Sequence, residues 1–134
     1  MNCPSCGVEM GTLESEDETL HRCETCGSLW TELSDLNRLL LQNNMPGLDS
    51  LGGKINLDAL PGQCPECLID LVEVKNSAPQ HSLAYASCES CGGILVMDDF
   101  SSCADVDEAF KHLVAFFTAF QHKMKRAPAP GAAS

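Results

Sequence analysis

The chain has 134 residues, the length of one domain, and its Asp and Glu residues outnumber Lys and Arg by nineteen to eight, which gives a formal charge of −11. This charge argues against a protein that reads duplex DNA, because such proteins draw most of their affinity from neutralising phosphates. No segment approaches the roughly 20 apolar residues of a membrane span, and the first residues lack the basic start and apolar core of a signal peptide. We therefore expect a soluble, cytoplasmic protein.

Eight of the nine cysteines form four Cys-x2-Cys pairs, which fall into two sets with 16 and 20 residues between the pairs. This spacing is typical of zinc sites. Four thiolates complete a tetrahedral zinc shell and leave no position for a catalytic water, so we expect two structural zinc ions, no enzyme and no catalytic residue. The predicted ligands are Cys3, Cys6, Cys23 and Cys26 for the first ion, and Cys64, Cys67, Cys88 and Cys91 for the second.

Three other uses of these cysteines are less consistent with the sequence than zinc. A disulfide framework suits an exported chain with an even cysteine count, whereas here Cys103 is left over. A redox dithiol needs one Cys-x2-Cys pair at the head of a helix, and four pairs in two matched sets do not fit that pattern. An iron–sulfur cluster also accepts four cysteines, so zinc versus iron stays open at this point.

The two cysteine sets belong to a duplicated unit, because Cys-Pro-Ser-Cys at 3–6 matches Cys-Pro-Glu-Cys at 64–67 and Cys-Glu-Thr-Cys-Gly at 23–27 matches Cys-Glu-Ser-Cys-Gly at 88–92. Each unit predicts a β-hairpin between its two knuckles, the Cys-x2-Cys turns that hold the metal. The predicted hairpin strands are residues 8–13 and 19–22 in the first unit and 68–74 and 82–87 in the second.

A helix is predicted after the first unit, because Leu33, Leu36, Leu39 and Leu40 recur at helical spacing. We expect Trp30 to pack beneath this helix, and Thr31 or Ser34 to cap it. The predicted organisation is ribbon 1 with its short helix at 1–43, a linker at 44–63, ribbon 2 at 64–100, a long amphipathic helix at 101–126 and a disordered tail at 127–134.

The long helix carries an apolar stripe at helical spacing, and Ser102 with Asp105 predicts a capping box at its start. Two interpretations of the stripe are open: it forms a core shared by both ribbons, or it pairs with a second copy or another protein. Phe116 lies off the main stripe, which favours a second contact. The candidate partner-binding residues are Phe110, Leu113, Phe116, Phe117, Phe120 and Met124.

The first unit also carries Gly27, Trp30, Glu32, Asp35 and Leu36 after its second knuckle, as Cys-x2-Cys-Gly-x2-Trp-x-Glu-x2-Asp-Leu. This motif resembles the transcription factor IIB-type zinc-finger family of small bacterial zinc ribbons. The second unit is a degenerate copy, with Leu95 in place of the Trp and Met-Asp-Asp-Phe at 97–100 in place of the acidic motif. The resemblance implies zinc ribbons that run into helices and is weakly specific for any activity.

Together these features predict a small metal-stabilised α+β fold of two zinc ribbons, each followed by a helix. The expected function is a non-enzymatic adaptor that binds another protein, with RNA polymerase or another large assembly implied by the resemblance, and with a homodimer through the C-terminal helix as a further option. The acidic surface suits a basic protein face. A nucleic-acid-binding ribbon and, less favoured, a dithiol redox protein remain as alternatives.

Overall fold

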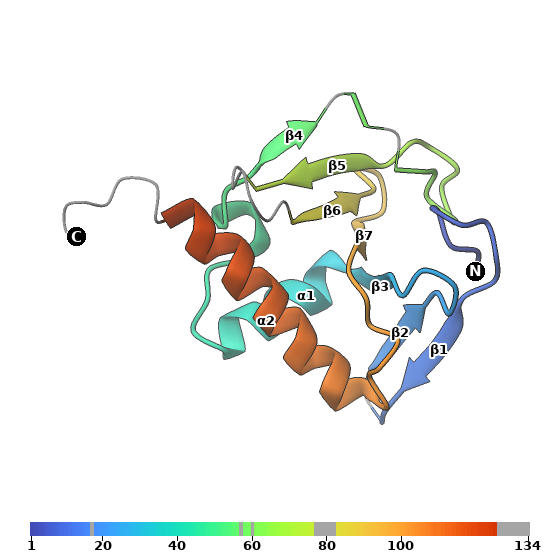
Figure 1. Ribbon diagram of the computed structural model, residues 1–134, viewed down its shortest axis with the longest axis horizontal. Coiled ribbons are helices and arrows are strands. Elements are labelled where there is room, and N and C mark those ends of the chain that lie inside the picture. Colours follow the sequence, from blue (N-terminus) through green and yellow to red (C-terminus); the bar gives the residue numbers. More distant parts are fainter. Residues whose placement is uncertain (17, 57, 60, 77–82, 126–134) are drawn as a thin grey trace.

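The computed structural model describes residues 1–125 except 17, 57, 60 and 77–82, and in that part of the chain the strands form one antiparallel sheet with two α-helices (Figure 1). The strand order is β1-β2-β3-β7-β6-β5-β4. The elements are β1 Gly11–Glu14, β2 Thr19–Arg22, β3 Leu29–Glu32, α1 Leu33–Gln42, a short 3₁₀ helix η1 Leu48–Ser50, β4 Lys54–Asn56, β5 Val72–Lys75, β6 Ala84–Ser87, β7 Gly93–Val96 and α2 Val106–Lys125. No helix among the described residues is long and apolar enough to cross a membrane.

Both predicted hairpins are present. β1 pairs with β2 from Gly11 opposite Arg22 to Glu14 opposite Thr19, and β5 pairs with β6 in the matching register. The first knuckle of each module closes on an isolated bridge, Asn2 with Glu9 in one module and Gln63 with Asp70 in the other, at the same offset along the chain. The repeated pairing supports the duplication that the cysteine motifs indicate.

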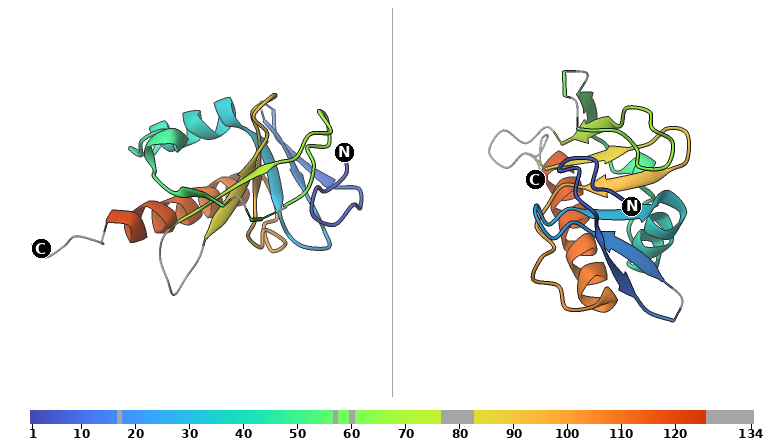
Figure 2. Two further views of the ribbon diagram at one scale, coloured as in Figure 1. Left: turned by 90° about the horizontal axis from the view of Figure 1, so that it is seen from above. Right: turned by 90° about the vertical axis from the view of Figure 1, so that its right-hand side faces the viewer.

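The two modules join through a strand pair that the sequence analysis did not predict. β3 and β7 run antiparallel with Trp30 opposite Leu95, and Leu95 is the residue that occupies the Trp30 position in the second copy. Because Leu29 pairs with Val96 and Thr31 with Ile94, the arrangement is symmetric about that central pair. The third strand of each ribbon thus pairs edge to edge with the third strand of the other, and the modules form one continuous sheet (Figure 2).

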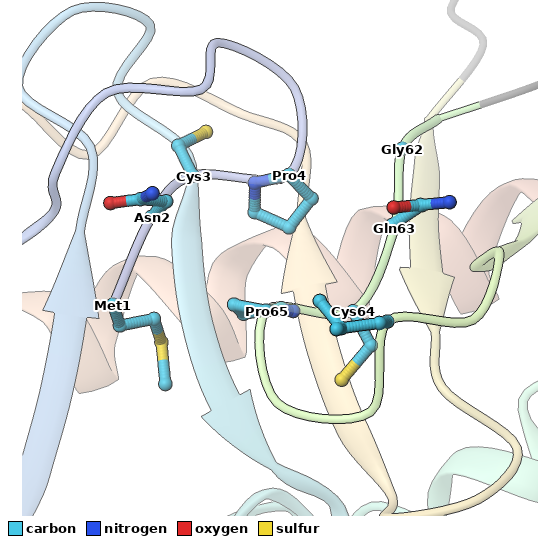
Figure 3. Close-up of a pocket in the computed structure, with 9 residues that line it drawn as sticks. Met1, Asn2, Cys3, Pro4, Gly62, Gln63, Cys64 and Pro65 are labelled. Atoms are coloured by element: carbon cyan, nitrogen blue, oxygen red, sulfur yellow. The ribbon is translucent and has the colours of Figure 1, made fainter.

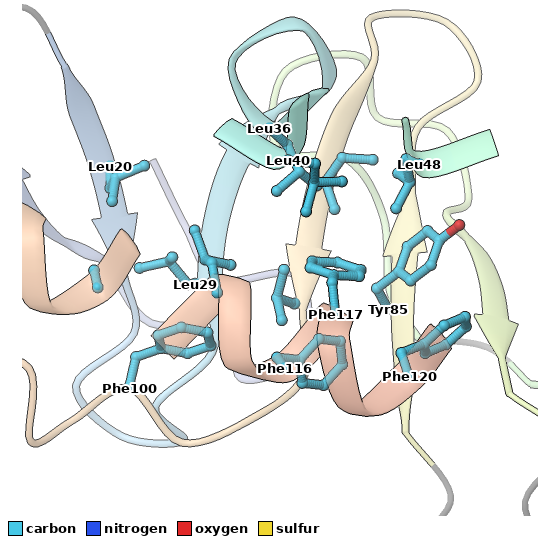
Figure 4. Packing of buried hydrophobic residues seen from close by; sticks show 14 of the residues in the cluster. Leu20, Leu29, Leu36, Leu40, Leu48, Tyr85, Phe100, Phe116, Phe117 and Phe120 are labelled. Carbon is cyan, nitrogen blue, oxygen red and sulfur yellow. The ribbon is translucent and has the colours of Figure 1, made fainter. Parts of the chain in front are cut away.

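Alternation along β3 and β7 gives the sheet two different buried faces. Leu29, Ile94 and Val96 join a core cluster with residues of both helices, shown in Figure 4. Trp30 and Leu95 belong to a separate cluster with the metal-ligand cysteines. Since successive side chains of a strand point to opposite faces, the helices cover one face and the knuckles the other.

Trp30 is therefore a core residue, as expected, but not beneath α1. It is 3% exposed and lies on the side of the sheet that the knuckles cover. Its indole ring packs so closely on Gly93 that a side chain at that position would collide with it. The reason is that Trp30 lies inside β3, where successive side chains point to opposite faces, so its side chain points away from that of Leu29 and from the helices.

α1 matches the predicted helix, with Leu36 and Leu40 buried, but not its predicted caps. Its N-cap residue is Glu32, which makes no capping bond through its side chain. The C-terminus ends in a Schellman motif, in which Asn44 takes a positive φ of 61° and the Met45 N–H bonds the Leu40 carbonyl at 2.9 Å. Within the predicted linker the described residues form η1 and β4, with Met45, Leu48 and Leu51 buried.

α2 begins at Val106, later than predicted, and the expected capping box of Ser102 is wrong. Instead Asp105 accepts the Glu108 N–H at 3.0 Å, and the Glu108 carboxylate accepts the Ala104 N–H at 2.8 Å. The chain before Asp105 is held in a turn, because the Arg22 guanidinium donates to the carbonyls of Phe100 and Cys103. This cross-module contact fixes where the helix starts.

The stripe of α2 is the shared core of both modules. Phe116, Phe117 and Phe120 share one cluster with Leu29 of the first module and Tyr85 of the second, and Figure 4 shows Phe117 and Phe120 beside Tyr85. The four side chains at its centre are at most 4% exposed: Leu113, Phe116, Phe117 and Phe120. The expectation that these four form a partner-binding surface is corrected, since no partner reaches a side chain that the protein itself encloses.

The two remaining candidates of the stripe differ from these four. Phe110 is only partly buried and lines a shallow groove of about 220 Å³ between the helices with Leu39, Asn43, Lys111 and Val114. The side chain of Met124 and the predicted tail at 127–134 lie outside the described part of the structure. The off-stripe position of Phe116 also has a simple explanation, because its ring packs edge-on against Phe117 with centroids 4.8 Å apart.

Candidate metal centres

Four knuckles with one shared hydrogen-bond pattern position the eight cysteines. In each knuckle the N–H of the first cysteine bonds a carbonyl five residues on, and its carbonyl accepts the N–H four residues on, as in Cys3 with Val8 and Gly7. Backbone N–H groups in the turn also point at the first sulfur, for example Cys6 N to Cys3 Sγ at 3.4 Å and Cys67 N to Cys64 Sγ at 3.4 Å. This pattern turns both sulfurs of a Cys-x2-Cys pair to one side.

The residue after the second cysteine of each knuckle takes a left-handed backbone. Three of these residues are glycines, Gly7, Gly27 and Gly92, with φ of 78°, 82° and 78°. In the first knuckle of the second module the residue is Leu68, with φ of 61° and a side chain that is 70% exposed. An L-residue with a Cβ is strained in this region, whereas glycine is not.

The sulfurs of each predicted set meet in one cluster, and all four ligand atoms lie within 4.8 Å of one another. Cys3 Sγ lies 3.8 Å from Cys26 Sγ, and Cys64 Sγ lies 3.6 Å from Cys91 Sγ. A zinc ion about 2.3 Å from four tetrahedral sulfurs places those sulfurs about 3.8 Å apart, so the clusters fit the ion. A disulfide needs sulfurs about 2.05 Å apart, and all nine cysteines are free.

The electrostatics of the clusters also call for a cation. Contact with the Cys26 sulfur and burial raise the pKa of Cys6 to about 12. Burial opposes ionisation of Cys26, but hydrogen bonds from Ser28 outweigh it and lower its pKa to about 7. In the second cluster burial raises the pKa of Cys91 to about 12, while backbone hydrogen bonds overcome burial and lower that of Cys88 to about 7. Four thiolates this close coexist only around a positive ion.

Comparison with known proteins agrees with this geometry. Residues 2–42 match the family model described as transcription factor zinc-finger. Over these residues the first module is similar to the TFIIB-type zinc ribbons. The second module lies outside that match, but its four-cysteine cluster and repeated knuckle bonds make it a second ribbon in tandem. The protein therefore holds two structural zinc ions, each with four cysteine ligands. No curated protein and no solved structure matches the chain.

The two ribbons support each other's metal sites through reciprocal backbone bonds. The Leu33 N–H at the start of α1 donates to the Gly92 carbonyl in the second ribbon at 2.8 Å. In the opposite direction, the Phe100 N–H donates to the Gly27 carbonyl in the first ribbon, also at 2.8 Å. Each acceptor directly follows a zinc ligand, so the second knuckle of one ribbon is held by the chain that leaves the other.

One further cluster of polar side chains contains no predicted zinc ligand and was not expected from the sequence. Cys103 Sγ is 3.9 Å from His112 Nδ1, and His112 Nε2 is 3.0 Å from Asp98 Oδ2. Cys103 is buried, and burial followed by the nearby Glu108 carboxylate raises its pKa. A thiol held protonated in this way is a packed residue and not an activated nucleophile. The three residues lie within fifteen positions of one another, but the turn before α2 brings them together at a spacing that matches no known motif.

The face that carries the zinc clusters is hollowed between the two first knuckles. A groove of about 560 Å³ is lined there by Met1, Asn2, Cys3, Pro4, Gly62, Gln63, Cys64, Pro65 and Leu68. Figure 3 shows the rings of Pro4 and Pro65, one from each ribbon, on this groove. The first knuckles touch at its edge, because a Cβ on Gly62 would collide with the Pro4 carbonyl. A second hollow of about 320 Å³ adjoins it through Met1, and Glu32, Asp35, Glu66 and His21 are among its lining residues.

Proposed function

We propose that this protein is a non-enzymatic adaptor that binds another protein through its knuckle face, which we define by Pro4, Val8, Pro65, Leu68 and Ile69. The observation that carries the proposal is the exposure of apolar side chains on the first knuckles. Val8 and Ile69 occupy equivalent positions in the two ribbons and are each 42% exposed, next to Leu68. Leu68 lines the groove between the first knuckles, and several exposed apolar side chains on adjacent turns are typical of interaction sites.

The burial of the α2 stripe supports this placement. With Phe116, Phe117 and Phe120 enclosed, the largest hydrophobic surface of the chain is used for folding and not for docking. The exposed large apolar residues that remain among the described ones are Val8, Leu41, Ile55, Leu68 and Ile69, and three of them lie on the first knuckles. The metal sites then act as the rigid support of the binding face, since a closed four-cysteine zinc site is structural.

The family of the first ribbon supports a partner within the transcription machinery or another large cytoplasmic assembly, such as RNA polymerase. A nucleic-acid partner is less well supported, because the formal charge of −11 becomes about −15 once eight thiolates bind two zinc ions. Arg22, the basic residue of the first hairpin, donates to the Phe100 and Cys103 carbonyls within the protein.

The experiment is capture by the immobilised zinc-loaded protein from lysate with and without nuclease, followed by direct binding of each retained protein after purification. We expect a purified protein to bind in a fixed ratio, with and without nuclease, and to be released when a chelator removes zinc. Retention of nucleic acid alone, or of no protein that binds after purification, would contradict the proposal.

A further inference from the structure

We infer that the groove between the first knuckles receives an apolar side chain from a lysine- or arginine-rich extended segment of the partner. This inference rests on the proposed function and specifies its partner chemistry. Both ribbons line the groove, and Figure 3 shows Pro4 of the first ribbon and Pro65 of the second on it. Leu68 of the second ribbon is a further lining residue. Its volume of about 560 Å³ is within the range of pockets that enclose a ligand group.

Leu68 is the feature that marks the groove as a binding site. Its backbone has the left-handed conformation that glycine fills in the three other knuckles, yet it carries a large apolar side chain. That side chain is 70% exposed, so it contributes little to the core of this chain. Strain that is not repaid by packing is typical of residues kept for contacts with a ligand.

The negative charge around the groove favours a basic segment as the occupant. Among the described residues, no lysine or arginine lines the groove. Cys3 and Cys64, which border it, are each a ligand of one zinc cluster, and each cluster carries a net charge of about −2. The bridge partners of the groove residues Asn2 and Gln63 are acidic, Glu9 and Asp70. A cation near this face is therefore attracted from several directions.

The adjoining hollow extends the same preference. Its lining includes Glu32, Asp35, Glu66 and His21, and in the described part of the chain it includes no lysine or arginine. A basic side chain next to the apolar one in the bound segment would lie toward these carboxylates. A second copy of this chain fits poorly, because docking two acidic proteins of about −15 each brings like charges together.

The test is an NMR titration of the ¹⁵N-labelled, zinc-loaded protein with three synthetic peptides of equal length. The first has one leucine between lysines, the second has serine in place of that leucine, and the third has glutamates in place of the lysines. We expect the first peptide to shift the amide signals of Gln63, Leu68 and their neighbours, and to bind at least about tenfold more tightly than the other two. Added salt should weaken this binding.

A matched pair of variants separates the groove from general surface apolarity. Leu68→Ala should weaken binding of the first peptide about tenfold, whereas Leu41→Ala, at a comparably exposed leucine on α1, should leave it unchanged. Both variants keep all eight cysteines, so zinc content serves as the folding control.

Several results would overturn the inference: equal binding of the glutamate peptide, shifts that map to the groove between α1 and α2, no binding of any peptide, or self-association of the protein in place of peptide binding. If the capture experiment still identifies a protein partner, only this inference fails and the proposed function stands. If capture identifies no protein partner while the peptide binds, the proposed function fails by its own test.

Discussion

Replacing Leu68 with glycine should stabilise the protein, although it removes a leucine side chain. Leu68 has φ of 61°, and a left-handed residue with a Cβ costs about 1–2 kcal/mol. Glycine avoids that strain but loses about 0.5–1 kcal/mol more in conformational entropy on folding. Because the side chain is 70% exposed, little packing is lost. The difference favours the variant by about 0.5–1 kcal/mol.

The assay is thermal unfolding at a fixed free zinc concentration, so that metal binding contributes equally to each variant. A gain of this size raises the Tm by about 2–4 °C in a domain of this length. Leu68→Ala is the matched control, because it removes the same side chain but keeps the Cβ and hence the strain. Its Tm should stay within about 1 °C of the wild type.

The equivalent position in the first ribbon gives the converse test. Gly7 has φ of 78°, and a Cβ there would meet no atom within 4 Å, so Gly7→Ala introduces strain without a collision. We expect a loss of about 1 kcal/mol. If Leu68→Gly is no more stable than Leu68→Ala, the leucine is not strained at this site and the argument that it is kept for binding loses its basis.

Three further changes test the core, the coupling of the ribbons and the metal chemistry. Phe117→Asp should lower the free energy of unfolding by more than about 4 kcal/mol and abolish a soluble, zinc-loaded product, because it removes a fully buried ring and buries a carboxylate. Ala115→Asp, on the exposed side of α2, should be tolerated. A well-folded Phe117→Asp protein would show that the stripe is not core. Cys88→Ser should weaken zinc binding in the first ribbon as well as the second, because it loosens the knuckle whose Gly92 carbonyl accepts the Leu33 N–H at the start of α1. Native mass spectrometry measures both occupancies, and one zinc held with unchanged affinity would refute this coupling. Burial raises the pKa of Cys3, and contact with a neighbouring sulfur raises the pKa of Cys6 to about 12, so both thiols are protonated at pH 7 without metal. Zinc binding should therefore displace at least about two protons per ion, and the zinc affinity should fall about 100-fold for each pH unit of acidification. Calorimetry in buffers of different ionisation enthalpy measures this release, and a finding of no released protons would contradict the prediction.

The metal sites and both hairpins were predictable from the sequence because their signals are local. Cys-x2-Cys spacing defines a turn, and the repeat at 3–26 and 64–91 gives the same prediction twice. The short helix was predictable for the same reason, since Leu36 and Leu40 lie one turn apart. The strain at Leu68 could also have been found, because glycine follows the second cysteine in the three other knuckles.

The joining of the ribbons was not predictable from these local patterns. β3 and β7 are short and have buried side chains on both faces, so they lack the apolar–polar alternation that identifies a strand with one exposed face. Their pairing brings Trp30 to Leu95, 65 residues away in the chain. The burial of the α2 stripe follows from the same pairing, because only a continuous sheet offers a surface long enough for that helix. An apolar stripe looks the same in sequence whether it seals a core or docks on a partner.

The central claim is that the knuckle face binds a protein. The most direct measurement is the affinity of a purified captured partner for the wild type, Leu68→Ala and Leu41→Ala, with two zinc ions verified in each sample. We predict that Leu68→Ala binds at least about tenfold more weakly, while Leu41→Ala binds like the wild type. Equal affinities for all three, or a loss with Leu41→Ala alone, would place the binding surface elsewhere on the molecule.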